Sequence, residues 1–362
     1  MTKRILLCAG GTGGHMFPAD ALARELIARG YHVELATDVR GQRFEPFAGG
    51  IHLHILSSGA MIGGLRGKLS AVWALLKGFV QSVVLIRAYR PDIVVGFGGY
   101  PTFPPVRMAQ MLGVPTVIHE SNAVMGVANL WLARGARAIA TPTEHMYGLR
   151  PADQTKIKVT GNPVRPDIAA ISRTAYPDFL PGRGIRMFVT GGSQGARILS
   201  DVLPQAMVQL PPEDRARIQI VQQVSADLIP ALEQTYRSAG VTCTLAPFFR
   251  DMADQLSAAH VFIGRSGAST VAEMAAAGRP AVFVPYPHHK DQQQKRNAET
   301  LVKAGAAWII EQKDFTPASV VAQMQVFLQN PDVLKIAGAK ALSCGEPQAA
   351  SRLADVVELE LR

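Results

Sequence analysis

The chain has 362 residues, of which 48% are hydrophobic and 18% are charged, and its formal net charge at pH 7 is +9. This length exceeds what one ordinary hydrophobic core serves, so we expect two folded domains with ample core material. The positive charge suits a nucleic acid, an anionic membrane surface or a phosphorylated substrate. Because the sequence has no lysine- or arginine-rich block, nucleic acid is the least favoured of the three and is not an expected partner.

The cysteines Cys8, Cys243 and Cys344 are far apart and form no CxxC pair. This spacing predicts reduced cysteines in a cytoplasmic protein, without a disulfide framework or a zinc site. The first four residues lead directly into an apolar run at 5–9, so no signal peptide is expected.

Short apolar runs alternate with helical patterns along the whole chain. In the first half we expect strands at 5–9, 32–37, 93–97, 116–118 and 138–140, and a helix at 18–29. In the second half we expect strands at 185–190, 218–222, 242–246, 260–263 and 281–284, and a last helix from near Pro347 to Leu361. This alternation is typical of α/β proteins with doubly wound parallel sheets, which bind ligands beyond the carboxyl ends of their strands.

A stretch rich in proline, aspartate and glycine lies near the middle of the chain, from 160 to 184, and indicates a linker. We therefore expect an N-terminal Rossmann-like domain over 1–163 and a C-terminal Rossmann-like domain over 164–340. The last segment, 341–362, is expected to be a helix that packs back on the N-terminal domain.

A glycine-rich loop, Gly10-Gly-Thr-Gly-Gly-His15, follows the first predicted strand. Its glycines let the backbone approach a ligand closely, and Pro18 suits the first turn of a helix. His15 is the only titratable side chain in the loop, and it either acts as a general base or caps the helix. Met16 stands where a GxGxxG pattern needs its last glycine, so a dinucleotide site with Asp38 on the ribose is a weak alternative.

An unusually apolar segment spans 69–86. A membrane-spanning helix is one interpretation, but the central Lys77 would cost about 3 kcal/mol and the segment is barely long enough. A helix buried in the core and a patch that dips into a membrane surface remain equally open. The second of these predicts contact with an anionic membrane surface through the region 61–87.

In the second half, the segment 262–273 reads as a strand that opens into an alanine-rich helix through small and polar residues at 265–267. Backbone N–H groups at such a helix start suit a phosphate or a diphosphate. Glu273 follows about one and a half turns into the helix, where its carboxylate can accept two hydroxyls of a sugar ring. Because neither the glycine loop at 10–15 nor the second glycine loop, at 191–196, contains GxxxxGK[ST], ATP hydrolysis of the P-loop kind is not expected.

Seven motifs occur together and in order: Gly10-Gly-Thr-Gly-Gly-His15, Gly98-Gly-Tyr100, His119-Glu120 with Asn122, Gly161-Asn-Pro-Val-Arg165, Gly191-Gly-Ser-Gln-Gly-Ala196, Arg265-Ser-Gly-Ala268, and Asp291 with Gln293-Gln294. In this combination the chain resembles the MurG family, in glycosyltransferase family 28, over almost its whole length. The resemblance implies the GT-B architecture, in which two Rossmann-like domains face each other across a cleft. It also implies inverting transfer of N-acetylglucosamine from UDP-N-acetylglucosamine to the C4 hydroxyl of an undecaprenyl-diphosphate-linked muramoyl peptide, a step of peptidoglycan synthesis.

The resemblance also implies roles for individual residues. Those in the first domain are Thr12, Gly13 and Gly14 at the pyrophosphate end of the donor, Asn122 at the transferred sugar, and Arg165 at the donor phosphates. Those in the second domain are Ser193 at the donor phosphates, the backbone of Phe249 at the uridine, Glu273 at the ribose, and Gln293 with Gln294 at the sugar. The implied phosphate cradle at the helix start is Gly267, Ala268, Ser269, Thr270, Val271 and Ala272.

An inverting transfer needs a base that removes the acceptor proton. His15 is the leading candidate for this base; Glu120 is the second, and its alternative role is to orient loops. The helix start and Arg165 would meet the charge of the leaving group, and with no Asp-x-Asp motif in the sequence, neither a metal nor a cofactor is expected.

Three other functions stay open: a UDP-N-acetylglucosamine epimerase, a diacylglycerol glycosyltransferase of the same fold, and an inert nucleotide-sugar sensor. For the favoured function, the resemblance implies a peripheral position on the cytoplasmic face of the bacterial inner membrane.

Overall fold

The computed structural model describes residues 2–44, 50–59, 65–179, 184–192, 195–289 and 291–361, with the side chains of 65–71 excepted. The chain divides into two compact units. The first unit comprises residues 1–165 together with 348–362, and the second comprises residues 166–347.

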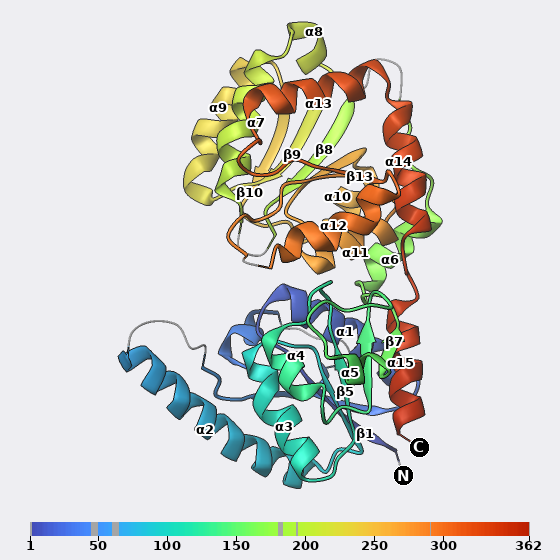
Figure 1. Ribbon diagram of the computed structural model, residues 1–362. Helices are drawn as coiled ribbons and strands as arrows, with labels where there is room; N and C mark the ends of the chain where they lie inside the picture. The colour runs from blue at the N-terminus through green and yellow to red at the C-terminus, as the bar shows by residue number, and fades with distance from the viewer. Residues whose placement is uncertain are drawn as a thin grey trace. The chain divides into compact units, whose positions relative to one another are not determined.

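The first unit is built on a seven-stranded sheet with the order β3-β2-β1-β4-β5-β6-β7 (Figure 1). Its strands are β1 (Arg4–Cys8), β2 (His32–Thr37), β3 (Leu53–Ile55), β4 (Ile93–Gly96), β5 (Thr116–His119), β6 (Ala138–Thr141) and β7 (Ile157–Val159), and each pairs in parallel with its neighbours. Its helices are α1 (Gly13–Ala28), α2 (Leu65–Tyr89), α3 (Phe103–Met111), α4 (Val127–Leu132), α5 (Pro151–Gln154) and α15 (Ala349–Glu360).

The second unit is built on a six-stranded parallel sheet with the order β10-β9-β8-β11-β12-β13. Its strands are β8 (Ile185–Thr190), β9 (Ile218–Gln223), β10 (Thr242–Ala246), β11 (Val261–Gly264), β12 (Ala281–Phe283) and β13 (Ala307–Ile309). Its helices are α6 (Pro166–Ala170), α7 (Arg197–Gln209), α8 (Pro212–Arg215), α9 (Ile229–Ser238), α10 (Met252–Ala258), α11 (Ala268–Ala276), α12 (Gln293–Lys303), α13 (Pro317–Gln329) and α14 (Asp332–Ser343). The predicted fold class, an α/β protein with two doubly wound parallel sheets, is confirmed.

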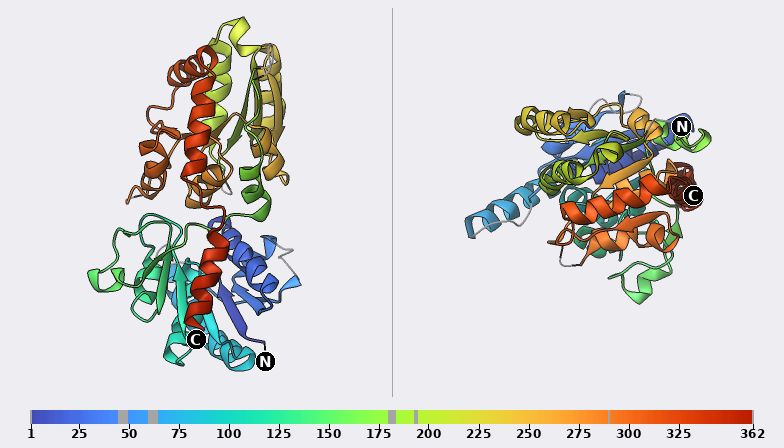
Figure 2. Two further views of the ribbon diagram at one scale, coloured as in Figure 1. Left: turned by 90° about the vertical axis from the view of Figure 1, so that its right-hand side faces the viewer. Right: turned by 90° about the horizontal axis from the view of Figure 1, so that it is seen from above.

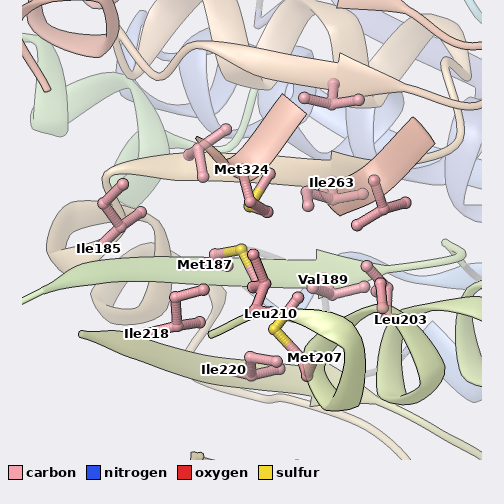
Figure 3. Packing of buried hydrophobic residues seen from close by; sticks show 14 of the residues in the cluster. Ile185, Met187, Val189, Leu203, Met207, Leu210, Ile218, Ile220, Ile263 and Met324 are labelled. Carbon is pink, nitrogen blue, oxygen red and sulfur yellow. The ribbon is translucent and has the colours of Figure 1, made fainter. Parts of the chain in front are cut away.

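Each sheet buries apolar side chains on both faces, as expected for parallel strands covered by helices. In the second unit, Ile185, Met187 and Val189 alternate along β8 and pack with side chains of α7 and α13 (Figure 3). Phe188, between them in sequence, packs on the opposite face of the sheet with Phe262. The period of two along the strand therefore serves two separate cores.

The last helix, α15, belongs to the core of the first unit. Leu353, Ala354 and Val357 are fully buried on the face of the sheet that also carries α1 (Figure 2). The expected start of this segment at 341 falls inside α14, whose Ala341 is buried in the second unit. For this reason the chain returns to the first unit only at 347/348.

In both sheets the order of the strands reverses next to the first strand of the unit: the following strands are added on one side of it, and the later strands on the other. β1 pairs with β2 on one side and β4 on the other, and β8 pairs with β9 and β11 in the same way. Doubly wound sheets bind ligands at the carboxyl ends of the strands on either side of this reversal. The loops after β1, β4, β8 and β11 are the glycine-containing motifs, so the fold puts each pair of motifs at a ligand-binding position.

Helix α1 begins at Gly13, so the expectation that it begins at Pro18 was wrong. The carbonyl of Thr12 accepts hydrogen bonds from the N–H groups of His15 and Met16, at 3.0 Å and 2.9 Å, which starts the helix before the proline. Pro18 lies inside the helix. His15 is therefore held in the first helical turn, which fixes its backbone more firmly than a loop would.

Candidate functional site

In the first unit, the His15 ring packs against the loop that follows β4. A Cβ atom built on Gly98 would lie 3.6 Å from His15 Nδ1, and one built on Gly99 would lie 3.4 Å from Nε2. Both glycines have positive φ angles, +83° and +82°, which favour glycine at these positions. The backbone of this loop thus approaches the imidazole closely, and the Gly10–His15 and Gly98–Tyr100 motifs meet around one titratable ring.

Burial lowers the pKa of His15 below its usual value. The Glu120 carboxylate and the Phe97 carbonyl act in the opposite direction, and the Arg40 guanidinium adds to the lowering. An imidazole with a lowered pKa is neutral at pH 7, which is the state that a general base requires.

Glu120 is 3% exposed, and its carboxylate accepts four hydrogen bonds. Oε1 accepts from the backbone N–H and the side-chain Nδ2 of Asn122, at 3.1 Å and 2.9 Å. Oε2 accepts from the backbone N–H of Gly126 and from Asn129 Nδ2, both at 2.9 Å. These bonds join the loop after β5 to the start of α4, so the carboxylate holds Asn122 in place.

His119, next to Glu120, is 0% exposed, and burial lowers its pKa from 6.5 to about 4. Between these two values the unfolded chain binds a proton that the folded chain does not, so stability is fully present above pH 6.5 and falls as the pH drops towards 4. Through the titration of His119, we expect the free energy of unfolding to be about 2 kcal/mol lower at pH 5 than at pH 7. Urea unfolding at both pH values should show that His119→Gln loses less unfolding free energy between pH 7 and pH 5 than the wild type does. Equal losses would contradict the lowered pKa of His119.

Asp38 does not offer a free carboxylate to a ribose. Its Oδ2 accepts hydrogen bonds from Arg40 Nε at 2.9 Å and from Ser58 Oγ at 3.0 Å, and its Oδ1 accepts from the Arg40 backbone at 3.1 Å. A Cβ atom on Gly11 would lie 2.2 Å from Oδ1. The carboxylate is used within the unit, and the dinucleotide alternative gains no support from it.

The remaining first-unit candidates lie close to the start of α1 or to Glu120. The Arg165 guanidinium carbon is 5.0 Å from the centroid of the Phe17 ring, and Phe17 also packs against Gly13. Arg165 therefore lies beside the helix start formed by Thr12, Gly13 and Gly14, although it comes from the end of the unit.

In the second unit, the space around the start of α11 is not crowded by other residues. Gly267 is its N-cap residue, and a Cβ atom there would meet nothing nearer than Thr270 Oγ1 at 3.9 Å. Residues 267–272 are partly exposed, and Glu273 is 7% exposed. Ser266, just before the cap, is 0% exposed, and its hydroxyl has no hydrogen-bond partner in the part of the chain that the structure describes. An uncrowded helix start with an unsatisfied hydroxyl fits an anionic ligand such as a phosphate.

The two glutamines predicted to contact sugar lie in the first turn of α12. The Asp291 carboxylate accepts a hydrogen bond from the Gln293 backbone N–H at 3.2 Å. Gln294 Oε1 accepts one from the Tyr286 backbone N–H at 2.9 Å. Both glutamine side chains are partly exposed.

The last two candidates of the second unit are Phe249 and Ser193. Phe249 is 8% exposed, and its ring packs edge-on against Phe188 with 5.6 Å between ring centroids, so the side chain is not presented to a ligand. Phe248, in contrast, is 63% exposed. Ser193 lies outside the described residues.

Sequence reasoning missed Asn129. This residue is 1% exposed on α4, and its Nδ2 donates to the His119 carbonyl at 3.1 Å as well as to Glu120. An asparagine in an otherwise apolar helical turn was the available signal, since a buried amide must find partners. Within the described ranges, no group of three or more His, Cys, Asp or Glu side chains is placed to hold a metal ion.

Comparison with known proteins covers nearly the whole chain. The N-terminal domain model of glycosyltransferase family 28 matches residues 5–141, and its C-terminal domain model matches residues 186–355. A UDP-N-acetylglucosamine–N-acetylmuramyl-(pentapeptide) pyrophosphoryl-undecaprenol N-acetylglucosamine transferase from Rhodospirillum centenum is 47% identical over 353 residues, which are 98% of this chain and 93% of the relative.

Solved structures give the same picture at the level of the fold. The crystal structure of Acinetobacter baumannii MurG matches with a TM-score of 0.77 and 28% identity, over 99% of both chains. A UDP-GlcNAc 2-epimerase from Neisseria meningitidis, bound to UDP-GlcNAc, matches with a TM-score of 0.66 over 98% of this chain and 100% of the epimerase. At 12% identity the second match concerns the fold alone.

Proposed function

The chain belongs to glycosyltransferase family 28, and from this premise we propose that it transfers N-acetylglucosamine from UDP-N-acetylglucosamine to an undecaprenyl-diphosphate-linked N-acetylmuramoyl peptide. The name of the R. centenum relative contains the same donor, acceptor and transferred group. The acceptor atom in our proposal is the C4 hydroxyl of the muramoyl sugar, and the anomeric carbon of the donor is inverted.

The start of α11 carries the donor half of this proposal. The Ser266 hydroxyl lacks a partner among the described residues, and Gly267 leaves space that a diphosphate can occupy. The partial positive charge of the helix start favours an anion there. In this arrangement residues 267–272 bind the diphosphate, and Glu273, about one and a half turns from the helix start, binds the ribose hydroxyls.

The other donor contacts in the proposal follow the family motifs. Gln293 and Gln294 bind the sugar hydroxyls, and Asn122 binds the transferred sugar. The remaining contacts are made by Thr12, Gly13, Gly14, Arg165 and Ser193 to the phosphate region, and by the Phe249 backbone to the uracil.

His15 is the base in this proposal. Its imidazole takes the proton of the acceptor hydroxyl while the hydroxyl oxygen forms a bond to the anomeric carbon. The bond from that carbon to the UDP oxygen breaks, and the electron pair leaves with UDP. The start of α11 and the Arg165 guanidinium stabilise the negative charge that develops on the phosphate. Glu120 acts as a positioning residue through Asn122 and Asn129, since its four hydrogen bonds occupy both oxygens.

An epimerase is the second candidate function, because a UDP-GlcNAc 2-epimerase has the same fold. Incubating the purified chain with UDP-N-acetylglucosamine alone separates the two functions. Our proposal expects the donor to remain unchanged without an acceptor, whereas accumulation of a 2-epimer would replace the proposal with the epimerase.

We also propose that α2 contacts an anionic membrane surface on the cytoplasmic side. Its exposed apolar side chains are Val72, Trp73, Leu76, Val80 and Val84, which are 42–74% exposed. The stretch Val72–Tyr89 is long and apolar enough to span a membrane, and 28% of it is buried. Val72, Leu76, Val80 and Val84 follow one another at steps of four residues, with Trp73 beside them, so they lie on one face of the helix. The N-terminal part of α2 extends away from the sheet (Figures 1 and 2). A helix with one buried and one exposed apolar face suits interfacial contact better than a core position.

Replacing Trp73 and Val80 together with serine should lower binding to vesicles of phosphatidylcholine and phosphatidylglycerol at least fivefold, because two large exposed apolar groups are lost. Phe79 is unsuitable as a target, since its ring packs against Phe103 with 6.0 Å between centroids. The affinity for UDP should not change. Equal sedimentation of wild type and variant with these vesicles would sink the membrane proposal.

A further inference from the structure

Arg265 joins the loops that follow three neighbouring strands of the second unit. It lies directly after β11, and its Nη1 donates to the carbonyls of Val284 and Pro285, which follow β12, at 2.9 Å and 3.1 Å. Its Nη2 donates to Oε1 of Gln312, in the loop after β13, at 2.6 Å. One guanidinium group therefore connects the carboxyl-end loops of β11, β12 and β13.

The same guanidinium group also contacts Tyr286, the residue that follows Pro285. Its central carbon is 5.5 Å from the centroid of the Tyr286 ring, a cation–π arrangement. The Tyr286 backbone N–H donates to Gln294 Oε1 at 2.9 Å. Arg265 thus orients a short segment, 284–286, whose last amide holds the side chain of Gln294.

This contact determines what Gln294 can offer to a ligand. A backbone N–H can bond only to the oxygen of the glutamine amide, so the orientation of the amide follows from chemistry. The Nε2 group, with two N–H donors, is then the part of the amide that remains for a sugar. Gln294 would donate to sugar hydroxyl oxygens rather than accept from sugar hydroxyl groups.

The backbone at the start of α12 is constrained as well. Gln292, the N-cap residue, has a left-handed conformation with φ +50°, and its N–H donates to the His289 carbonyl at 3.0 Å. A left-handed conformation costs a non-glycine residue about 1 kcal/mol and persists where the surroundings enforce it. The helix start and the Gln294 side chain are therefore held separately, the first by its own turn and the second by the segment 284–286.

We propose that Arg265 is a positioning residue for the donor sugar, which acts through the segment 284–286 to hold Gln294 with its amide N–H groups towards the sugar. This inference rests on the proposed function, since it assigns Gln294 to the sugar of UDP-N-acetylglucosamine. The competing role for Arg265, two residues before the start of α11, is direct binding of the donor phosphates. In the structure three of its N–H groups are already used by Val284, Pro285 and Gln312.

A double-mutant cycle separates the two roles. Arg265→Met and Gln294→Ala should each raise the Kd for UDP-N-acetylglucosamine about tenfold, and the double variant should be no weaker than the worse single variant. The Kd of UDP, which lacks the sugar, should stay within about twofold of the wild type in both single variants. Calorimetric titration measures all of these constants. A hundredfold loss in the double variant, or a UDP Kd that rises as much as that of the sugar nucleotide, would overturn the proposal.

A second variant keeps the test decisive if Arg265→Met does not fold. Gln312→Leu leaves the guanidinium group and removes one of its anchors, so it should raise the Kd for UDP-N-acetylglucosamine about threefold and leave the UDP Kd unchanged. An unchanged Kd for the sugar nucleotide in a folded Gln312→Leu variant would also overturn the proposal.

Gln294→Glu tests the orientation of the amide, because a carboxylate can still accept from Tyr286 but cannot donate to the sugar. It should match Gln294→Ala in its loss of sugar-nucleotide affinity, and wild-type affinity would count against the proposal. Arg237→Met, at an exposed position of α9, is the matched control and should change no constant. A wild-type chain that does not bind UDP-N-acetylglucosamine would overturn the proposed function itself, before any variant is compared.

Discussion

Replacing His15 with alanine should lower kcat about 10²- to 10⁴-fold, the usual contribution of a general base. The KM for UDP-N-acetylglucosamine should change little, because the donor contacts at α11 are unaffected. The variant should remain folded, with a melting temperature close to that of the wild type, since the ring packs against glycine backbone rather than into a large apolar core. A kcat equal to that of the wild type would remove His15 from the role of base.

The pH dependence of kcat provides an independent measurement on the same residue. The base must be neutral, and burial lowers the pKa of His15 below its usual 6.5. The wild-type kcat should therefore be constant near pH 7 and should fall only as the pH drops through a value below 6.5.

Other charged and titratable groups near His15 modulate this value. Glu120 raises the pKa of His15 and Arg40 lowers it, while His15 in turn lowers the pKa of His119. Arg40→Gln should consequently shift the acidic limb of the profile to higher pH. An exposed histidine of the same unit, His145, is the matched control, and His145→Ala should leave the profile unchanged.

Replacing Glu120 with glutamine should reduce the free energy of unfolding by about 3 kcal/mol and should also lower kcat. The NH₂ group of the new amide would replace one of the two carboxylate oxygens. It would then face N–H donors, either the two of Asn122 or those of Gly126 and Asn129, that now donate to that oxygen. Buried donors would be left without acceptors, and the loop that carries Asn122 would loosen. Urea unfolding measures the loss of stability.

The same variant distinguishes a positioning role from a role as base. A base that did not also hold the loop would lose activity on substitution while the protein kept its stability. Unchanged unfolding free energy together with a large loss of kcat would therefore contradict the positioning role. Glu144→Gln, at an exposed position of the same unit, is the matched control and should change stability by less than about 0.5 kcal/mol.

The inner strands of both sheets could be predicted from the sequence because each is a mostly buried segment rich in apolar residues. The prediction for 185–190 agrees with β8, and that for 32–37 agrees with β2. The strands that were not predicted are β3, β7 and β13, each three residues long and at the edge of its sheet. An edge strand pairs on one side only, so its residues are partly exposed and its apolar pattern is too short to stand out.

The glycine loops could be predicted because parallel strands bring their carboxyl ends to one edge of a sheet. The contacts within the loops could not. Glu120 Oε2 accepts hydrogen bonds from Gly126 and Asn129, and nothing in the spacing of these residues indicates that they turn back towards the carboxylate. The link between Arg265 and Gln294 likewise depends on the path of three separate loops. Local patterns identify the loops, whereas the tertiary fold decides which side chains meet.

The central claim is the transfer of N-acetylglucosamine to a muramoyl lipid. The most direct measurement is product analysis after incubating the purified chain with UDP-N-acetylglucosamine and a short-chain analogue of the undecaprenyl-diphosphate-linked muramoyl peptide. Mass spectrometry should detect a product heavier by one N-acetylglucosamine residue, and nuclear magnetic resonance should locate a β-linkage at C4 of the muramoyl sugar, together with an equal amount of UDP. UDP-N-acetylglucosamine that binds the chain but transfers no sugar to this acceptor would contradict the account.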